Sequence, residues 1–214
     1  MTIRSKQKII IDKPFNIVLV EPEIPPNTGN IARLCAATNT KLHLVHPLGF
    51  KITDRELKRA GLDYWHLLDI RHYDNWQEFT KACLNSNSEL ENRRIGESGI
   101  SPVPQLSSSP VLQLSSSPVR SSYYMSTRGE KNIWNVEFNP GDFLIFGSET
   151  KGLNEDILNQ NKDNVISIPM NGKTRSLNLS TAVGIVLYEA IRQVTIEKKL
   201  FDIIPVEKHN VGAG

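Results

Sequence analysis

Short apolar runs along the chain alternate with segments in which apolar residues recur at helical spacing. Residues 15–20, FNIVLV, form a β-branched run that stops at EPEIPPN, a pattern typical of a buried strand leading into a loop. The next segment predicts a helix, because its inward-facing positions recur at i, i+3, i+4 and i+7, namely Ile31, Leu34, Cys35 and Thr38. Asn27 or Thr28 could cap that helix, and residues 41–47, KLHLVHP, then predict another strand. The first part of the chain therefore predicts a strand, helix, strand unit.

The same alternation continues toward the C-terminal end. Residues 54–61, DRELKRAG, predict a charged helix that ends at Gly61, and residues 76–84, WQEFTKACL, predict another short helix. Further strands are expected within 123–127, 142–147 and 164–170, and a long last helix is expected from about Thr181. Strands separated by helical stretches indicate an α/β fold, with a mainly parallel sheet flanked by helices.

One stretch, at about 85–122, departs from this alternation because it is rich in Ser and Pro. Residues 103–110, VPQLSSSP, are followed directly by the near copy VLQLSSSP at 111–118. Such a composition buries little apolar surface, so we expect a disordered surface insertion, with a partner-binding segment as the alternative. The chain is then a single domain over residues 1–214, interrupted by this insertion.

Composition narrows the class of protein. The 214 residues are 39% hydrophobic, which suffices for one substantial core. Neither a spanning run of about 18 apolar residues nor a secretory leader is visible, so we expect a cytoplasmic protein without a membrane segment. Cys35 and Cys83 lie far apart without a second ligand at metal spacing, which favours reduced, buried thiols. The net charge of +2 does not by itself indicate a nucleic-acid partner.

Several familiar catalytic motifs are absent. Residues 147–153, GSETKGL, have the glycine spacing of a phosphate-binding P-loop, but Leu153 stands where that loop needs a lysine. No GxGxxG dinucleotide motif follows a predicted strand, and no HExxH or GxSxG motif or pair of catalytic carboxylates is present. The sequence thus gives no support for a nucleotide hydrolase, a dinucleotide enzyme or a metal site.

Four polar clusters do stand out, because each follows a predicted strand or apolar run. They are NTGNIAR at 27–33, STRG at 126–129, GSETKG at 147–152 and NGKTRSLNLS at 171–180. Ligands of open α/β sheets bind beyond the carboxyl ends of the strands, so the four clusters predict one composite site. Ordinary turns are the alternative for any single cluster, since Gly, Asn and Ser dominate turns.

Three motifs, in order, give a resemblance to a known family. PPNTGNIAR, LIFGSETKGL and IPMNGKTRSLNLSTAVGIVLYEA closely resemble the SPOUT class of RNA methyltransferases, over roughly residues 14–83 and 123–195. Within that class the chain is similar to the small enzymes of the TrmL type, which methylate the ribose 2'-oxygen of the tRNA wobble nucleotide. The resemblance implies a C-terminal trefoil knot, S-adenosylmethionine as cofactor, a homodimer, no metal, and tRNA, in relatives leucine tRNA, as substrate.

The resemblance also implies roles for individual residues. Asn27 and Arg33 match the polar pair beside the reacting ribose. Because a guanidinium is effectively always protonated, we expect Arg33 to hold a phosphate and orient the hydroxyl rather than to act as the base. The implied cofactor-binding residues are Met125, Thr127, Gly147, Glu149, Ile168, Met170, Ser176, Leu177 and Asn178. RNA phosphates would be contacted by Arg55, Lys58, Arg59, Lys151, Lys173 and Arg175.

The last predicted helix is apolar around most of its circumference. Its apolar positions are Val183, Ile185, Val186, Leu187, Ala190, Ile191 and Val194. Such a helix is buried either against a second subunit or at the centre of one subunit. Two alternatives to a wobble-ribose methyltransferase stay open: a methyltransferase acting on ribosomal RNA or another tRNA position, and an RNA-binding protein that has lost catalysis.

Overall fold

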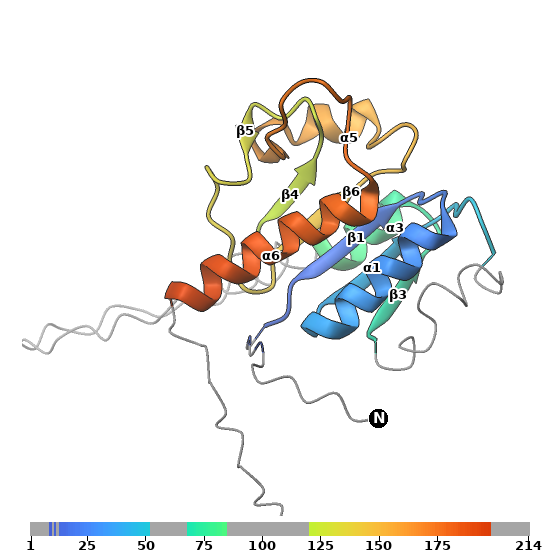
Figure 1. Cartoon of the computed structure of the whole chain (residues 1–214). Coiled ribbons are helices and arrows are strands. Elements are labelled where there is room, and N and C mark those ends of the chain that lie inside the picture. The colour runs from blue at the N-terminus through green and yellow to red at the C-terminus, as the bar shows by residue number, and fades with distance from the viewer. Residues whose placement is uncertain (1–8, 10, 12, 52–67, 85–119, 198–214) are drawn as a thin grey trace, which may run out of the picture.

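The computed structural model of the chain describes residues 9, 11, 13–51, 68–84 and 120–197 (Figure 1). Its centre is a seven-stranded parallel sheet in the order β3-β2-β1-β6-β4-β7-β5. The strands are β1 Asn16–Val20, β2 Lys41–Val45, β3 Ile70–Tyr73, β4 Ser122–Met125, β5 Lys131–Asn132, β6 Phe143–Phe146 and β7 Val165–Ser167. This confirms the predicted α/β class with a parallel sheet.

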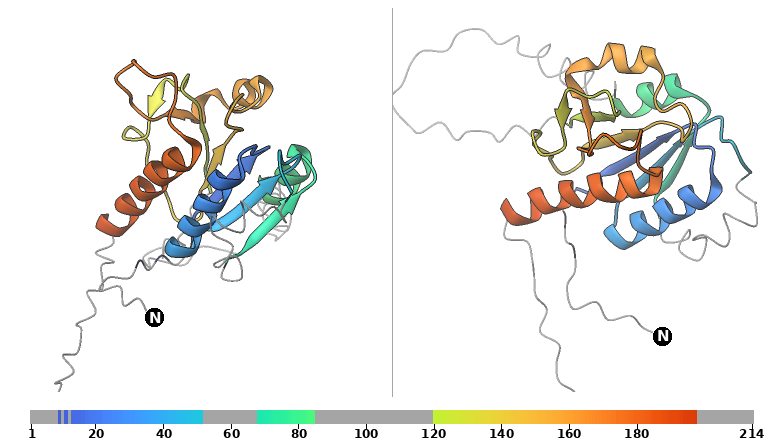
Figure 2. Two further views of the ribbon diagram at one scale, coloured as in Figure 1. Left: turned by 45° about the vertical axis from the view of Figure 1, so that its right-hand side comes forward. Right: turned by 45° about the horizontal axis from the view of Figure 1, so that its top comes forward.

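Helices cover both faces of the sheet (Figure 2). The helical segments are α1 Pro25–Thr38, α3 Trp76–Phe79, the π-helical turn η2 Thr80–Leu84, α5 Glu155–Gln160, the 3-10 turn η3 Lys162–Asn164 and α6 Leu179–Glu197. Alternate residues of β1 show the two layers, because Ile17 and Leu19 pack in the core with α1 and α6. Val18 and Val20 instead belong to a second core with α3, η2 and α5.

Helix α1 begins earlier than its polar residues predict. Ile24 occupies the N-cap position without a side-chain cap, and proline fills the first two helical positions. Proline suits this place because its fixed φ is helical and its missing N–H would have had no partner. The prediction that Asn27 or Thr28 caps the helix is therefore wrong. As a consequence, the Asn27 side chain is available for contacts at the site described below.

Helix α6 begins at Leu179, two residues before its expected start, because the side chain of Asn178 caps it. The Asn178 Oδ1 accepts from the backbone N–H of Ser180 at 2.9 Å and of Thr181 at 3.3 Å. Six of the seven predicted apolar positions are buried in the core of this chain, and Ile185 is the exception. Ile185 is 38% exposed and its neighbour Tyr188 is 51% exposed. One subunit thus buries most of the helix and leaves a narrow apolar face outside.

Both cysteines are free and buried, which confirms the prediction of reduced core thiols. Burial raises the pKa of Cys35 to about 12, so the thiol stays protonated and unreactive. None of the helices in the described ranges is long and apolar enough to cross a membrane. The predicted charged helix at 54–61 and all but the last residues of the insertion at 85–122 lie outside the described residues, and the trefoil knot stays a prediction.

Candidate functional site

A cavity of about 790 Å³ opens at the carboxyl ends of β4, β6 and β7, beside the start of α6. All four polar clusters of the sequence reach this edge of the sheet, and each contributes lining residues. The structure thus brings the four clusters together around one cavity. The four clusters meet at this edge because the carboxyl ends of neighbouring parallel strands lie on the same side of the sheet.

Each of the nine residues that the family resemblance assigns to the cofactor lines this cavity. They are Met125, Thr127, Gly147, Glu149, Ile168, Met170, Ser176, Leu177 and Asn178. The cavity wall is mixed in character: Phe146, Ile166 and Leu153 supply buried apolar surface, while the loops supply hydroxyl, amide and backbone polar groups. This size, with apolar walls and a few polar groups, is typical of small-molecule and cofactor sites.

The loop that follows β6 folds back on its own beginning. The backbone N–H of Gly152 donates to the carbonyl of Ser148 at 2.9 Å, and the two residues form an antiparallel bridge. Gly152 has φ +72°, a left-handed conformation that glycine adopts without strain. A Cβ at Gly147 would overlap the backbone of Gly152 and Leu153. Glycine is therefore required at 147 for the loop to close on itself.

The carboxylate of Glu149 ties the β6 loop to the segment before α1. It accepts from the backbone N–H of Glu23 at 2.7 Å and of Ile24 at 3.2 Å, and from Asn27 Nδ2 at 2.9 Å. These donors lie at the N-terminal end of α1, where a negative charge is also favoured by the helix dipole. Both carboxylate oxygens of Glu149 are thus engaged by protein donors at the edge of the cavity.

Asn27 extends this contact to the third motif. Its Oδ1 accepts from Asn178 Nδ2 at 3.0 Å, across 151 residues of sequence. Asn178 in turn caps α6 through its own Oδ1. Glu149, Asn27 and Asn178 therefore form one hydrogen-bonded chain that fixes the three motif loops relative to one another.

Arg33 is set apart from the cavity wall. It lies six residues after Asn27 on α1, which is about 9 Å farther along the helix axis, and its side chain is exposed. It does not belong to the cavity lining, whereas Asn27 does. The structure thus brings Asn27 to the predicted cofactor residues and leaves Arg33 on the outer side of the same helix.

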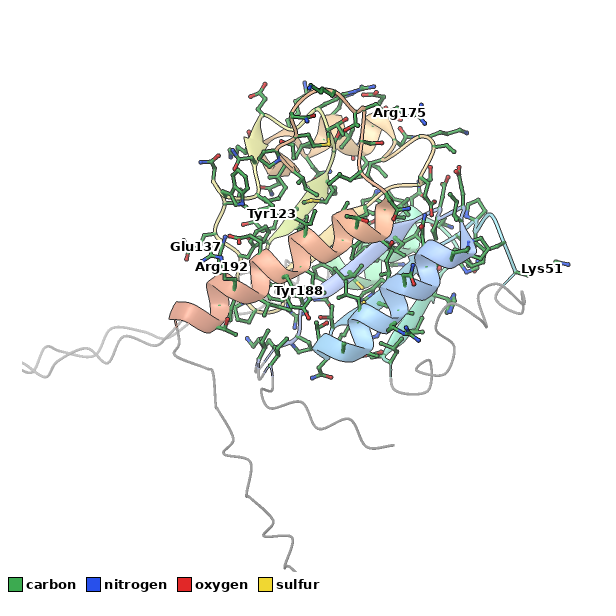
Figure 3. All side chains as sticks on the ribbon, in the orientation of Figure 1. Lys51, Tyr123, Glu137, Arg175, Tyr188 and Arg192 are labelled. Carbon is green, nitrogen blue, oxygen red and sulfur yellow. The ribbon has the colours of Figure 1, made fainter. Side chains whose placement is uncertain are left out.

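Among the predicted RNA contacts, Lys151 and Arg175 line the cavity. Figure 3 shows Arg175 on the loop that leads from β7 to α6. Lys173 belongs to that loop but not to the cavity wall. Arg55, Lys58 and Arg59 lie outside the described residues.

Two lining residues, Glu155 and Leu158 of α5, had no signal in the sequence analysis. Glu155 forms an ion pair with Arg128 of the STRG cluster. Helix α5 is six residues long and was not predicted as an element. Asn154 before it, whose side chain accepts from the backbone N–H of Asp156, is an N-cap signal that could have revealed it.

Within the described part of the chain, no three His, Cys, Asp or Glu side chains are grouped so that they could hold a metal ion. His43 is buried beside Tyr73 and Asn16, away from the cavity, and burial lowers its pKa to about 4. It is therefore a neutral core residue near pH 7, in agreement with the absence of any assigned catalytic histidine.

Comparison with known families decides what kind of protein carries this cavity. The model of the SpoU rRNA Methylase family matches residues 14–106 and 110–188. The chain belongs to this family. Among relatives of this SpoU methylase, the tRNA (cytidine(34)-2'-O)-methyltransferase of Saccharophagus degradans is 41% identical over 181 residues, which are 84% of this chain and 96% of the relative.

Solved structures agree with the family and with the fold. A structure described as giving insights into the 2-OH methylation of C/U34 on tRNA has a TM-score of 0.66 and 37% identity, covering 86% of this SpoU methylase and 97% of that chain. The SpoU methyltransferase AviRb of Streptomyces viridochromogenes, solved with AdoMet, has a TM-score of 0.62 at 22% identity. The match covers 87% of this chain and 60% of the AviRb chain. The second likeness concerns the fold alone.

Proposed function

We propose that this SpoU methylase transfers a methyl group from S-adenosylmethionine to the ribose 2'-hydroxyl of the wobble nucleotide of tRNA. One observation carries the proposal: the nine residues that the motifs assign to the cofactor meet around one cavity, beside Asn27. The relatives named above act on cytidine 34 or on C/U34 of tRNA, which supports this substrate. The leucine tRNAs used by similar enzymes are the first candidates.

The cavity fits S-adenosylmethionine on physical grounds. Its volume of about 790 Å³ lies within the usual range for cofactor sites, and its apolar wall can cover the adenine ring. The loop before α6, with Ser176, Leu177 and Asn178, supplies polar backbone and side chains for the amino-acid end. When bound, the cofactor supplies an activated methyl group on a sulfonium. We infer that no metal ion is required.

The protein's own part in the reaction is to position groups and to favour loss of a proton. Arg33, exposed on α1, would grip a phosphate next to the reacting ribose and favour the ionised form of its hydroxyl. Asn27 stands between Glu149 and Asn178 and would fix the ribose side of the cavity. Glu149 lines the cavity, but its carboxylate holds the segment before α1, so we assign it a positioning role.

The direct test of this function is a transfer assay with labelled cofactor and purified tRNA. The label should appear in an alkali-resistant linkage at the wobble ribose, because a 2'-O-methyl group prevents attack on the neighbouring phosphate. Addition of a chelator should leave transfer unchanged. Label only in ribosomal RNA or at another tRNA position would support the first alternative, and RNA binding without transfer would support a non-catalytic protein.

We also propose that the protein acts as a homodimer through the α1 and α6 layer. Ile185 and Tyr188 are exposed apolar residues of α6, and Ile24 and Leu177, which also line the cavity, are exposed just before α1 and α6. An apolar surface of this kind marks a contact surface.

The free, buried cysteines suit a reducing compartment, which supports the cytoplasm as the location.

Substitution of Ile185 tests the dimer. Ile191 is unsuitable because it is buried in the core of one subunit, where a charge would unfold the protein. Ile185→Glu should raise the dimer dissociation constant by about 100-fold or more, because an unpaired carboxylate would be buried in the contact. Light scattering should then give the chain mass of 24.1 kDa instead of twice that value. Gln77→Glu, on the opposite face of the sheet, should remain dimeric; a monomeric unmodified protein at micromolar concentration contradicts the proposal.

A further inference from the structure

The most exposed large apolar side chain that the structure describes lies outside the cavity and outside the α1 and α6 layer. It is Trp134, which is 66% exposed and lies two residues after the end of β5. Exposure of so much indole surface to water is unfavourable, and neither the proposed cofactor site nor the proposed dimer uses it. The Trp134 side chain is therefore a candidate contact for a binding partner.

The backbone presents this indole from a fixed position. Ile133, next to it, is buried, and its N–H donates to the carbonyl of Ser167 on β7 at 3.0 Å. The N–H of Trp134 itself donates to Asn132 Oδ1 at 2.9 Å, and Asn135 closes the turn onto the Asn132 carbonyl at 3.0 Å. The backbone of the turn therefore needs no ordering when a partner binds, which favours its use as a contact.

This turn lies beside the wall of the cavity. Strand β5 pairs with β7, and Ile168 and Met170, which follow β7, line the cavity. Figure 1 and both views of Figure 2 show β5 beside the loop that leads from β7 to α6. Trp134 thus follows a strand whose neighbour in the sheet, β7, continues into the cavity wall.

Two cations, Arg128 and Lys131, precede the indole on the same segment, which also carries Glu130 and Glu137. Lys131 Nζ donates to the backbone carbonyl of Asp163 at 2.9 Å. Arg128, at the cavity rim, is six residues before the indole. An exposed aromatic ring with cations along the same segment is the arrangement by which proteins bind single-stranded nucleic acid.

We propose that Trp134 stacks on an unpaired nucleobase next to the methylated nucleotide, an inference that rests on the proposed function. The partner is a base in a single-stranded loop, because bases within a duplex have no free face. Trp134 would then be a positioning residue: it would hold the loop so that the neighbouring ribose enters the cavity.

The test compares Trp134→Ala with Trp134→Phe in binding to an anticodon stem-loop RNA that the unmodified enzyme methylates. Trp134→Ala should weaken binding by about 5- to 100-fold, since stacking of one base on an aromatic ring contributes on the order of 1–3 kcal/mol. Trp134→Phe keeps an aromatic face and should stay within about threefold. The slope of log K against log salt should not change in Trp134→Ala, whereas Lys131→Ala should reduce it by about one.

Two results would overturn the inference. One is RNA affinity of Trp134→Ala within twofold of the unmodified protein. The other is weaker RNA binding that comes together with loss of cofactor affinity or of dimer mass, since the indole would then support the fold or the partner subunit. Absence of methylation at the wobble ribose by the unmodified enzyme would instead count against the proposed function, so the two failures are distinguishable.

Discussion

Gly147→Ala should lower the affinity for S-adenosylmethionine by about 100-fold, which calorimetry can measure directly. The added Cβ would overlap the backbone of Gly152 and Leu153, and backbone cannot move aside by changing a rotamer. The loop after β6 would have to open, and both Ser148 and Gly152, which close it, line the cavity. Overpacking of this kind costs about 1–3 kcal/mol, and the cofactor surface would be lost with the loop.

Gly184→Ala is the matched control for this change. Gly184 lies in α6, and a Cβ there would meet only Leu34 Cδ2, at 4.0 Å. The same added methyl group should therefore leave cofactor affinity within about twofold and stabilise the helix by up to about 1 kcal/mol. If Gly147→Ala binds the cofactor as tightly as the unmodified protein does, the cavity is not the cofactor site.

Much of the sheet was predictable, because its central strands are continuous apolar runs. The runs FNIVLV and DFLIFG predicted β1 and β6, which are buried on both faces. The polar clusters after the strands predicted the residues that line the cavity. β3 and β5 had no such pattern. In β3 two of the four residues are exposed, and β5 is two residues long, so each depends on the neighbouring strand with which it pairs.

The contacts within the site were less predictable than its residues. The motifs named Glu149, Asn27 and Asn178, but not that the Glu149 carboxylate would accept from Asn27 and from two backbone N–H groups. These partners are more than 120 residues apart in sequence, so their contact follows from the order of strands in the sheet. For the same reason the sequence could not show that Asn27 would line the cavity while Arg33 would not.

This separation makes the substitution of Arg33 the most informative one for the reaction. Because Asn27 lines the cavity and Arg33 does not, Arg33→Ala should bind S-adenosylmethionine like the unmodified enzyme. Methyl transfer should nevertheless fall by about 100- to 1,000-fold, as expected when a charged contact in the transition state is removed. Single-turnover transfer to tRNA and calorimetry with the cofactor measure the two effects separately.

A second substitution at this position shows whether the geometry of the Arg33 guanidinium or only its charge is needed. Arg33→Lys keeps the charge but not the planar fork that holds a phosphate with two hydrogen bonds, so its transfer rate should lie between those of the alanine variant and the unmodified enzyme. Arg71→Ala is the control: it removes an exposed arginine of β3 that pairs with Asp69, at the far edge of the sheet from β5, and should leave transfer within about twofold. Full transfer by Arg33→Ala would remove Arg33 from the reaction, while the cavity would keep its assignment. A loss of cofactor affinity equal to the loss of transfer would place Arg33 at the cofactor instead of at the RNA.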